Sequence, residues 1–173
     1  MTQTKILAIR RELAADLVMF VLLLCIAIVA PLIRQQAITG TIVNAVLFVS
    51  AVSLGIRGAV LIALVPSIFS LSVGLLPALL APMVPFIMIG NIILILVFDF
   101  LRKRNYWLGI VSGSFLKFIF LASVSSVVIN LLLKKEIAPQ VATMMSWPQL
   151  LTALAGGAVA YLVLRGLNRS DVK

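Results

Sequence analysis

Long apolar runs, separated by short basic or proline-containing stretches, dominate this chain. Five runs, of which only the fourth contains a charged residue, cover residues 17–33, 35–56, 58–98, 106–133 and 149–164. A helix that crosses a bilayer needs about 20 mostly apolar residues. The run 58–98 is too long for one such helix, and its prolines divide it into two. The pattern predicts six transmembrane helices, over residues 13–33, 41–55, 58–76, 82–101, 106–133 and 146–165.

The composition excludes a soluble enzyme and an intrinsically disordered chain. Of 173 residues, 63% are hydrophobic and 11% are charged, whereas soluble domains have roughly 45–50% apolar and about 25% charged residues. Mean hydropathy is +1.24. We expect an all-α integral membrane protein, a compact bundle of six helices forming a single domain over 1–173. Residues 1–12 would be a cytoplasmic lead-in and residues 166–173 a cytoplasmic tail.

The basic residues predict the orientation of this bundle. The formal net charge is +9, and Lys and Arg concentrate in cytoplasmic loops of membrane proteins. With six spans and both termini in the cytoplasm, the outer loops carry only Arg34, Lys134 and Lys135. The inner segments carry the ten basic residues Lys5, Arg10, Arg11, Arg57, Arg102, Lys103, Arg104, Arg165, Arg169 and Lys173. We therefore read the surplus charge as membrane topology and expect no nucleic-acid partner. The first apolar run is longer than a secretory signal core, so we expect it to remain as a helix.

Lys117 and Asn91 are the main candidates for a binding site. Lys117 lies about 11 residues into its predicted helix, roughly 16 Å deep at 1.5 Å per residue, and Asn91 should lie at a similar depth. A cation near the midplane is costly unless it meets a partner, a cavity or a ligand. No acidic residue shares this depth, which favours an anionic ligand group. The alternative is that Lys117 extends toward the inner interface or reaches Asp99.

The helix over 106–133 has a second polar face. At 100° per residue, Lys117 points nearly opposite to four residues that cluster together, Ser112, Ser123, Ser126 and Asn130. Both faces cannot line the same side of one pocket. Serines also pack between membrane helices, so the sequence leaves open which face lines a pocket.

Polar residues near the predicted outer ends suit the mouth of an outward-facing site. Asn44 lies near the start of the helix 41–55, and Trp147 and Gln149 lie near the start of the last helix. We include all three as candidate substrate-binding residues. Trp147 is also typical of an interfacial anchor.

Catalysis and bound metal find little support. The chain has one cysteine, Cys25, and no histidine, so a zinc or haem site built on these residues is excluded, and we expect no cofactor. A pair between Ser114 and Lys117, three residues apart on one helix, is the remaining catalytic possibility. No phosphate-binding loop of the GxxxxGK[ST] type is present, so we expect no ATP-hydrolysing unit in this chain. Because other catalytic signatures are also missing, we predict a protein that is not an enzyme.

Several features together resemble the substrate-binding S components of energy-coupling-factor transporters. These features are six helices in fewer than 180 residues, a short second helix, the segment that runs from Gly55 to Ser67, the proline-rich approach to Gly90 and Asn91, and the Trp147-Pro148 start of the last helix. The resemblance covers nearly the whole chain. It implies a subunit that binds a vitamin-like micronutrient from outside and then associates with a transmembrane coupling protein and two ATPases.

One departure from that family concerns the docking face. S components often carry an Ala-x-x-x-Ala motif on the first helix, and here the alanines of that helix have other spacings. Gly55, Ala59 and Ala63 are spaced four apart, which allows close helix approach. We therefore take these three residues as the alternative docking row.

A rival interpretation is a small membrane scaffold without a ligand, similar to the rod-shape-determining membrane subunit of bacterial cell-wall complexes. Its size and helix count are similar. An unpaired midplane cation such as Lys117 favours the solute-binding interpretation.

Overall fold

The computed structural model describes residues 3–74, 78–132 and 138–167, and in this part of the chain the only regular structure is helical. The helices are α1 (Gln3–Val29), α2 (Gln36–Ser53), α3 (Gly55–Ser72), α4 (Val84–Arg102), α5 (Tyr106–Leu132), α6 (Ala138–Met144) and α7 (Trp147–Gly166), with short 3-10 turns η1 (Ala30–Ile33) and η2 (Ala78–Met83).

Six helical segments of the described chain are long and apolar enough to cross a membrane. They are Arg10–Ile33, Gln36–Ser53, Gly55–Ser72, Ala81–Arg102, Tyr106–Asn130 and Val141–Gly166. The predicted count of six is confirmed, as is the all-helical fold. Their length and composition are those expected of a multi-pass membrane protein.

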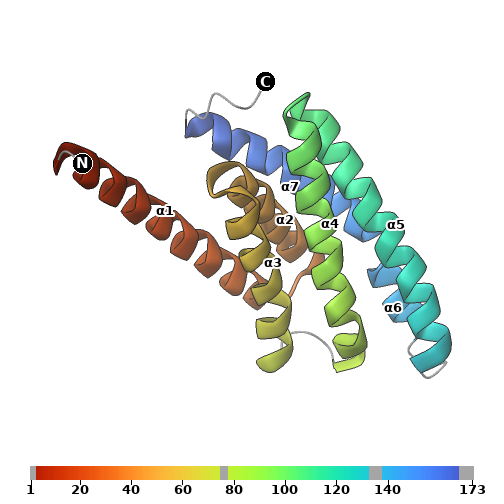
Figure 1. Cartoon of the computed structure of the whole chain (residues 1–173). Coiled ribbons are helices and arrows are strands. Elements are labelled where there is room, and N and C mark those ends of the chain that lie inside the picture. Colours follow the sequence, from red (N-terminus) through yellow and green to blue (C-terminus); the bar gives the residue numbers. More distant parts are fainter. Residues whose placement is uncertain (1–2, 75–77, 133–137, 168–173) are drawn as a thin grey trace.

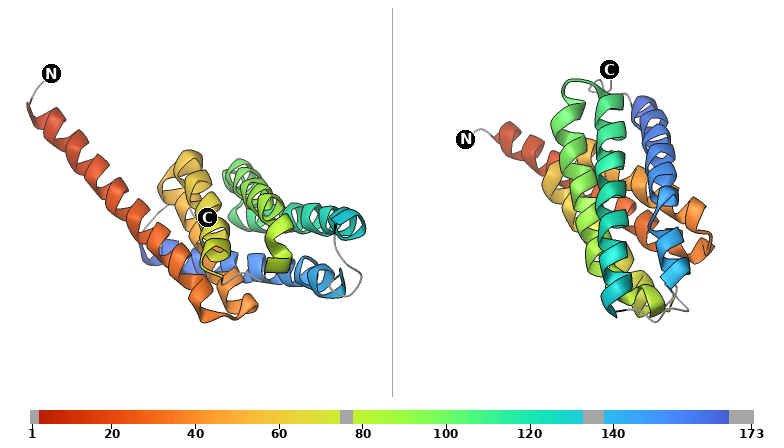
Figure 2. Two further views of the ribbon diagram at one scale, coloured as in Figure 1. Left: turned by 90° about the horizontal axis from the view of Figure 1, so that it is seen from below. Right: turned by 90° about the vertical axis from the view of Figure 1, so that its right-hand side faces the viewer.

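Successive long helices run in opposite directions, and α1 is the most loosely attached. Figure 1 shows α4 alongside α5, whereas the N-terminal part of α1 runs away from the other helices. In Figure 2 this part of α1 again projects clear of the bundle. Many large apolar side chains of α1, such as Leu13, Leu17 and Val18, are exposed. Lipid is the natural environment for such a surface.

The N- and C-terminal ends of the described chain lie at the same end of the bundle (Figure 1). The turn between α2 and α3 and the connection between α4 and α5 also lie there, so Arg57 and the basic run 102–104 share this end. Arg34 lies at the opposite end, between η1 and α2. Lys134, Lys135, Arg169 and Lys173 fall outside the described residues, as does most of the predicted tail 166–173. The side chains of residues 1–9, which include Lys5, are also outside the description.

Several helix boundaries differ from the prediction. Helix α1 begins at Gln3, within the predicted lead-in, rather than at residue 13, and α3 ends at Ser72 rather than at residue 76. Helix α2 begins at Gln36 rather than at residue 41. Gly40 lies within it because the helix packs closely on α7 there, where a Cβ on Gly40 would lie 3.1 Å from Thr152 Cβ. The segment before the last helix, predicted as a loop, contains the short helix α6.

The main core is built by residues of α1, α2, α3, α4, α5 and α7. Its largest fully buried side chains include Phe48, Phe98 and Tyr106, which stack edge to face. Asp99 is buried beside them and accepts a hydrogen bond from Arg102 Nε at 2.8 Å.

Candidate functional site

Lys117 and two asparagines form a polar cluster between three helices. The Lys117 Nζ of α5 donates to Asn44 Oδ1 of α2 and to Asn91 Oδ1 of α4, at 2.7 Å each. The exposed fractions are 3% for Lys117, 2% for Asn44 and 3% for Asn91. We call these three residues the central cluster.

The central cluster lies at the middle of the apolar segments. Lys117 is within one residue of the centre of Tyr106–Asn130, and Asn91 and Asn44 each lie at the centre of their own segments, Ala81–Arg102 and Gln36–Ser53. In a bilayer this places all three polar side chains near the midplane, where polar groups are rare and usually functional.

Small residues bring the helices close enough for one lysine to reach both amides. A Cβ on Gly156 of α7 would lie 2.7 Å from Asn44 Cβ and 2.8 Å from the Thr41 carbonyl oxygen. A Cβ on Gly90 of α4, next to Asn91, would lie 3.3 Å from Leu121 Cγ. Because Gly156 and Gly90 have no side chain, the helices around the cluster can pack at this close spacing.

The cluster is rich in hydrogen-bond donors. An ammonium group has three N–H donors, and Lys117 uses two of them on the asparagine oxygens. Both amides turn their oxygens toward Nζ, so their Nδ2 groups point elsewhere. Among the hydrogen bonds of the described residues, none starts from either Nδ2. A ligand group that binds here would therefore meet N–H donors around a cation.

No carboxylate balances this cation within the described chain. Asp99 pairs with Arg102 at 2.7 Å, and the partners of Lys117 are both neutral amides. The alternative in which Lys117 reaches Asp99 or extends to the interface is therefore wrong. The arrangement suits a compact anionic or carbonyl-bearing group, which would accept from Lys117 and the amides together.

The predicted site residues fall into two groups. Lys117 and Asn91 lie at the same depth, as expected. Asn44 joins them, whereas the prediction placed it near the outer end, because α2 begins five residues earlier than expected. Trp147 is 60% exposed and Gln149 donates its Nε2 to the Met144 carbonyl. Both lie near the start of α7 and do not join the hydrogen bonds of the central cluster.

The proposed docking row is mostly internal in this structure. Ala59 and Ala63 are fully buried in the core, where their small side chains serve packing between helices of this chain. Gly55 has a φ of 73° at the tight turn between α2 and α3, a conformation that favours glycine. In this conformation the row offers no continuous outer face.

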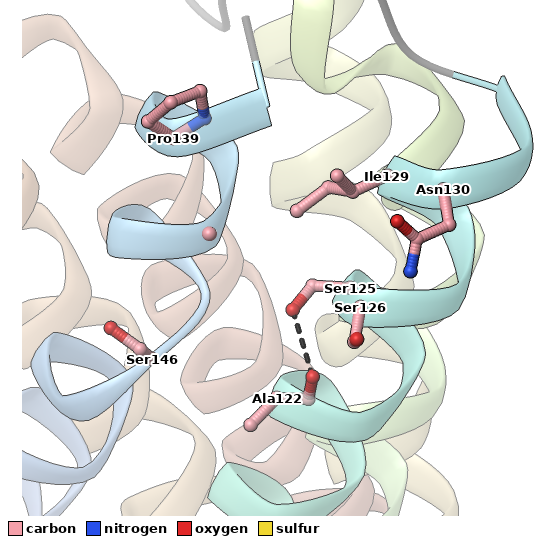
Figure 3. Close-up of a pocket in the computed structure, with 8 residues that line it drawn as sticks. Ala122, Ser125, Ser126, Ile129, Asn130, Pro139 and Ser146 are labelled. Carbon is pink, nitrogen blue, oxygen red and sulfur yellow. Dashed lines mark hydrogen bonds between the residues drawn. The ribbon is translucent and has the colours of Figure 1, made fainter. Parts of the chain in front are cut away.

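The serine side of α5 lines a pocket of its own. This pocket, of about 460 Å³, lies between α5 and α6 and is lined by Ala122, Ser125, Ser126, Ile129, Asn130, Pro139, Ala142 and Ser146 (Figure 3). We call it the serine pocket. Of the serine face predicted from sequence, Ser126 and Asn130 line it, and the exposed Ser123 does not. Of the two faces that the sequence left open, the one with Ser126 and Asn130 lines this pocket, whereas Lys117 lies in the central cluster.

Sequence reasoning missed Ser125, which is 4% exposed and lines the pocket. The signal for it was present, since Ser125 lies two turns from Lys117 on the buried side of α5. Ser114, one turn away in the other direction, is also buried, and its Oγ has no hydrogen-bond partner. It therefore forms no catalytic pair with Lys117 in this structure.

Within the described residues, no group of three or more His, Cys, Asp or Glu side chains could hold a metal ion. Comparison with protein-family models finds no matching family. Comparisons with curated proteins and with solved structures find no match either.

Proposed function

We propose that this chain is a membrane-embedded solute-binding subunit, with the central cluster as its binding site for a small anionic solute. The observation that carries the proposal is the Lys117 ammonium, held at mid-segment by Asn44 and Asn91 without a carboxylate partner. Keeping a cation at this depth costs several kcal/mol on most scales. A ligand carboxylate or phosphate would offset that cost, and neutral amides do so only in part.

The type of transport system we propose is the energy-coupling-factor kind. The chain would be its S component, taking up a vitamin-like micronutrient from outside with both termini in the cytoplasm. Support comes from the six apolar helices and from the basic residues gathered at the end of the bundle that carries both termini. The sequence has no phosphate-binding loop, so a separate coupling protein and its ATPases would supply the energy.

The second candidate is a scaffold that binds other membrane proteins and no solute. The projecting α1, with Leu13, Leu17 and Val18 exposed, favours this candidate because it offers a long apolar surface beside the bundle. In this case the central cluster would serve only to hold α2, α4 and α5 together.

Heating the detergent-purified protein with a panel of anionic and neutral vitamins separates the two candidates. A ligand at 100 times its Kd, bound only by the folded state, adds about 2.7 kcal/mol of apparent stability. The solute-binding function predicts such a shift with at least one anionic compound, and its loss in the Lys117→Met variant. Native mass spectrometry of the untreated protein should also show a retained small molecule. A panel without any shift, together with a ligand-free mass, would favour the scaffold.

A further inference from the structure

A buried serine beside the central cluster has no hydrogen-bond partner. Ser114 lies on α5 one turn before Lys117, it is 0% exposed, and its Oγ has no partner among the described residues. Two other buried serines, Ser50 and Ser70, each donate their Oγ to a carbonyl of their own helix. A buried hydroxyl without a partner costs free energy, so it calls for a specific explanation.

The contacts around Ser114 place it at the edge of the central cluster. On α5 it lies between Ile110 and Lys117, at spacings of four and three residues that keep all three on one buried face. A Cβ on Gly157 of α7 would meet the Ile110 side chain, and the preceding residue of α7, also a glycine, packs on Asn44. Asn44 in turn accepts from Lys117. Ser114 is therefore enclosed where α5 meets α2 and α7.

The direction of helical side chains turns Lys117 toward this serine. Side chains of an α-helix tilt toward its N-terminus, so a long side chain lies over the turn before its own Cα. For Lys117, Ser114 belongs to that turn. The two side chains do not bond to each other. The third N–H of the ammonium and the serine O–H are thus two donors that one accepting group can satisfy together.

The single cation of the cluster determines which accepting group fits. The two partners of Lys117 within the described chain are neutral amides, and a serine is neutral as well. A carboxylate has one negative charge and two acceptor oxygens, so it balances the ammonium and offers one oxygen to each donor. A phosphate monoester carries about −1.5 to −2 charges near pH 7. It would leave uncompensated negative charge near the midplane, where charge is costly.

We propose that Ser114 is a further binding residue of the central cluster, and that the solute is recognised through one carboxylate held between Lys117 Nζ and Ser114 Oγ. One carboxylate oxygen accepts from the ammonium and the other accepts from the hydroxyl. The inference rests on the proposed function and narrows its solute from anions in general to monocarboxylates. It also gives the buried hydroxyl a partner that the described chain does not supply.

Matched pairs of vitamins test the carboxylate. The probes are nicotinate with nicotinamide, biotin with its primary amide, and flavin mononucleotide as a phosphate monoester. Affinity is measured from the thermal stability of the detergent-purified protein over a series of ligand concentrations. At least one acid should stabilise the protein, its amide should bind at least tenfold more weakly, and flavin mononucleotide should cause no shift. Stabilisation by flavin mononucleotide, or an amide that binds as tightly as its acid, would overturn the proposal.

The Ser114→Ala variant tests the hydroxyl in the same assay. It should weaken binding of the acid at least tenfold, because a hydrogen bond to a charged group is lost. Its melting temperature without ligand should not fall, since this hydroxyl bonds to nothing in the described chain. Ser125→Ala is the matched control and should bind normally, because Ser125 is 4% exposed on the same helix and donates to the Ala122 carbonyl. Ser114→Cys, similar in size and with a weak S–H donor, should give an intermediate affinity.

The outcomes separate this inference from the proposed function. Binding that is lost in Lys117→Met and unchanged in Ser114→Ala would overturn the role of Ser114 and leave the solute-binding function standing. A lower melting temperature of ligand-free Ser114→Ala would also overturn that role, because the hydroxyl would then serve the fold. No stabilisation by any anionic vitamin would overturn the function and this inference together.

Discussion

Lys117 on α5 and Asn91 on α4 are 26 positions apart in the sequence, and their side chains meet at 2.7 Å in the interior of the bundle. The lysine donates and the amide oxygen accepts, which directs the amide nitrogen away from the cation. Asn44 binds Lys117 in the same way, so the ammonium and two amide nitrogens together form a group of hydrogen-bond donors between α2, α4 and α5.

Replacing Lys117 by Met should weaken binding of an anionic ligand at least tenfold, or about 1.4 kcal/mol, while the protein still inserts into the membrane. Met has a similar length and removes the charge, so the helices can stay packed. The measurement is ligand affinity of the purified variant, using the compound found in the panel. Lys103→Met, at an exposed position of the α4–α5 connection, is the control and should bind normally. Equal affinities of both variants would leave Lys117 with a structural role only.

Replacing Asn91 by Leu should lower the free energy of unfolding by about 1–3 kcal/mol, because it leaves the buried ammonium with one fewer acceptor. The same change in the Lys117→Met background should cost less, since no ammonium remains to be satisfied. A double-mutant cycle, measured by chemical unfolding in detergent, gives the coupling directly. Strictly additive effects would show that the 2.7 Å contact contributes nothing to stability.

Replacing Gly156 by Ala should lower stability by about 1–3 kcal/mol through overpacking. The added Cβ would lie 2.7 Å from Asn44 Cβ and 2.9 Å from the Ala45 backbone nitrogen, so α7 and α2 must separate. Gly166→Ala is the matched control on the same helix, because nothing lies within 4 Å of its Cβ position. Thermal unfolding of the two variants makes the comparison, and equal melting temperatures would contradict the close approach at Gly156.

Single cysteines at the two ends of the bundle should react from opposite faces of the membrane. In a Cys25→Ala background, an impermeant thiol reagent added to intact cells should label Gln35→Cys and leave Arg104→Cys unlabelled. The reverse should hold in inverted vesicles. Both positions are exposed in the structure. Labelling of Arg104→Cys alone in intact cells would reverse the proposed orientation. Labelling of both positions from one face would contradict an even number of crossings for the chain, because three of the six proposed crossings lie between them.

The fold was largely predictable because length and hydropathy decide where a helix can cross a membrane. The depth of Lys117 and Asn91 followed from the same residue counts. Asn44 was misplaced for a local reason, since Gly40 and its neighbouring threonines resemble a loop and yet form the first turns of α2. In the structure Thr41 Oγ1 donates to the Ala37 carbonyl and Gly40 packs on Thr152.

What the sequence could not give is the meeting of Lys117 with Asn44, which lie 73 positions apart. Periodicity places residues on the faces of their own helix and does not say which helices become neighbours. The serine pocket was hidden for the same reason, because α6 lines one side of it and was predicted as a loop. Ser125 could have been found by following the turns from Lys117, whereas Pro139 could not.

The central position of Lys117, Asn91 and Asn44 in their segments has a consequence for the direction of the proposed solute transport. A charge held equally far from two water layers faces equal stretches of hydrocarbon on either side, so its location alone favours neither loading nor release. Any preference must come from the residues stacked above and below it. On α5 these differ, with leucine followed by serine toward one surface, and serine, isoleucine and tyrosine toward the other.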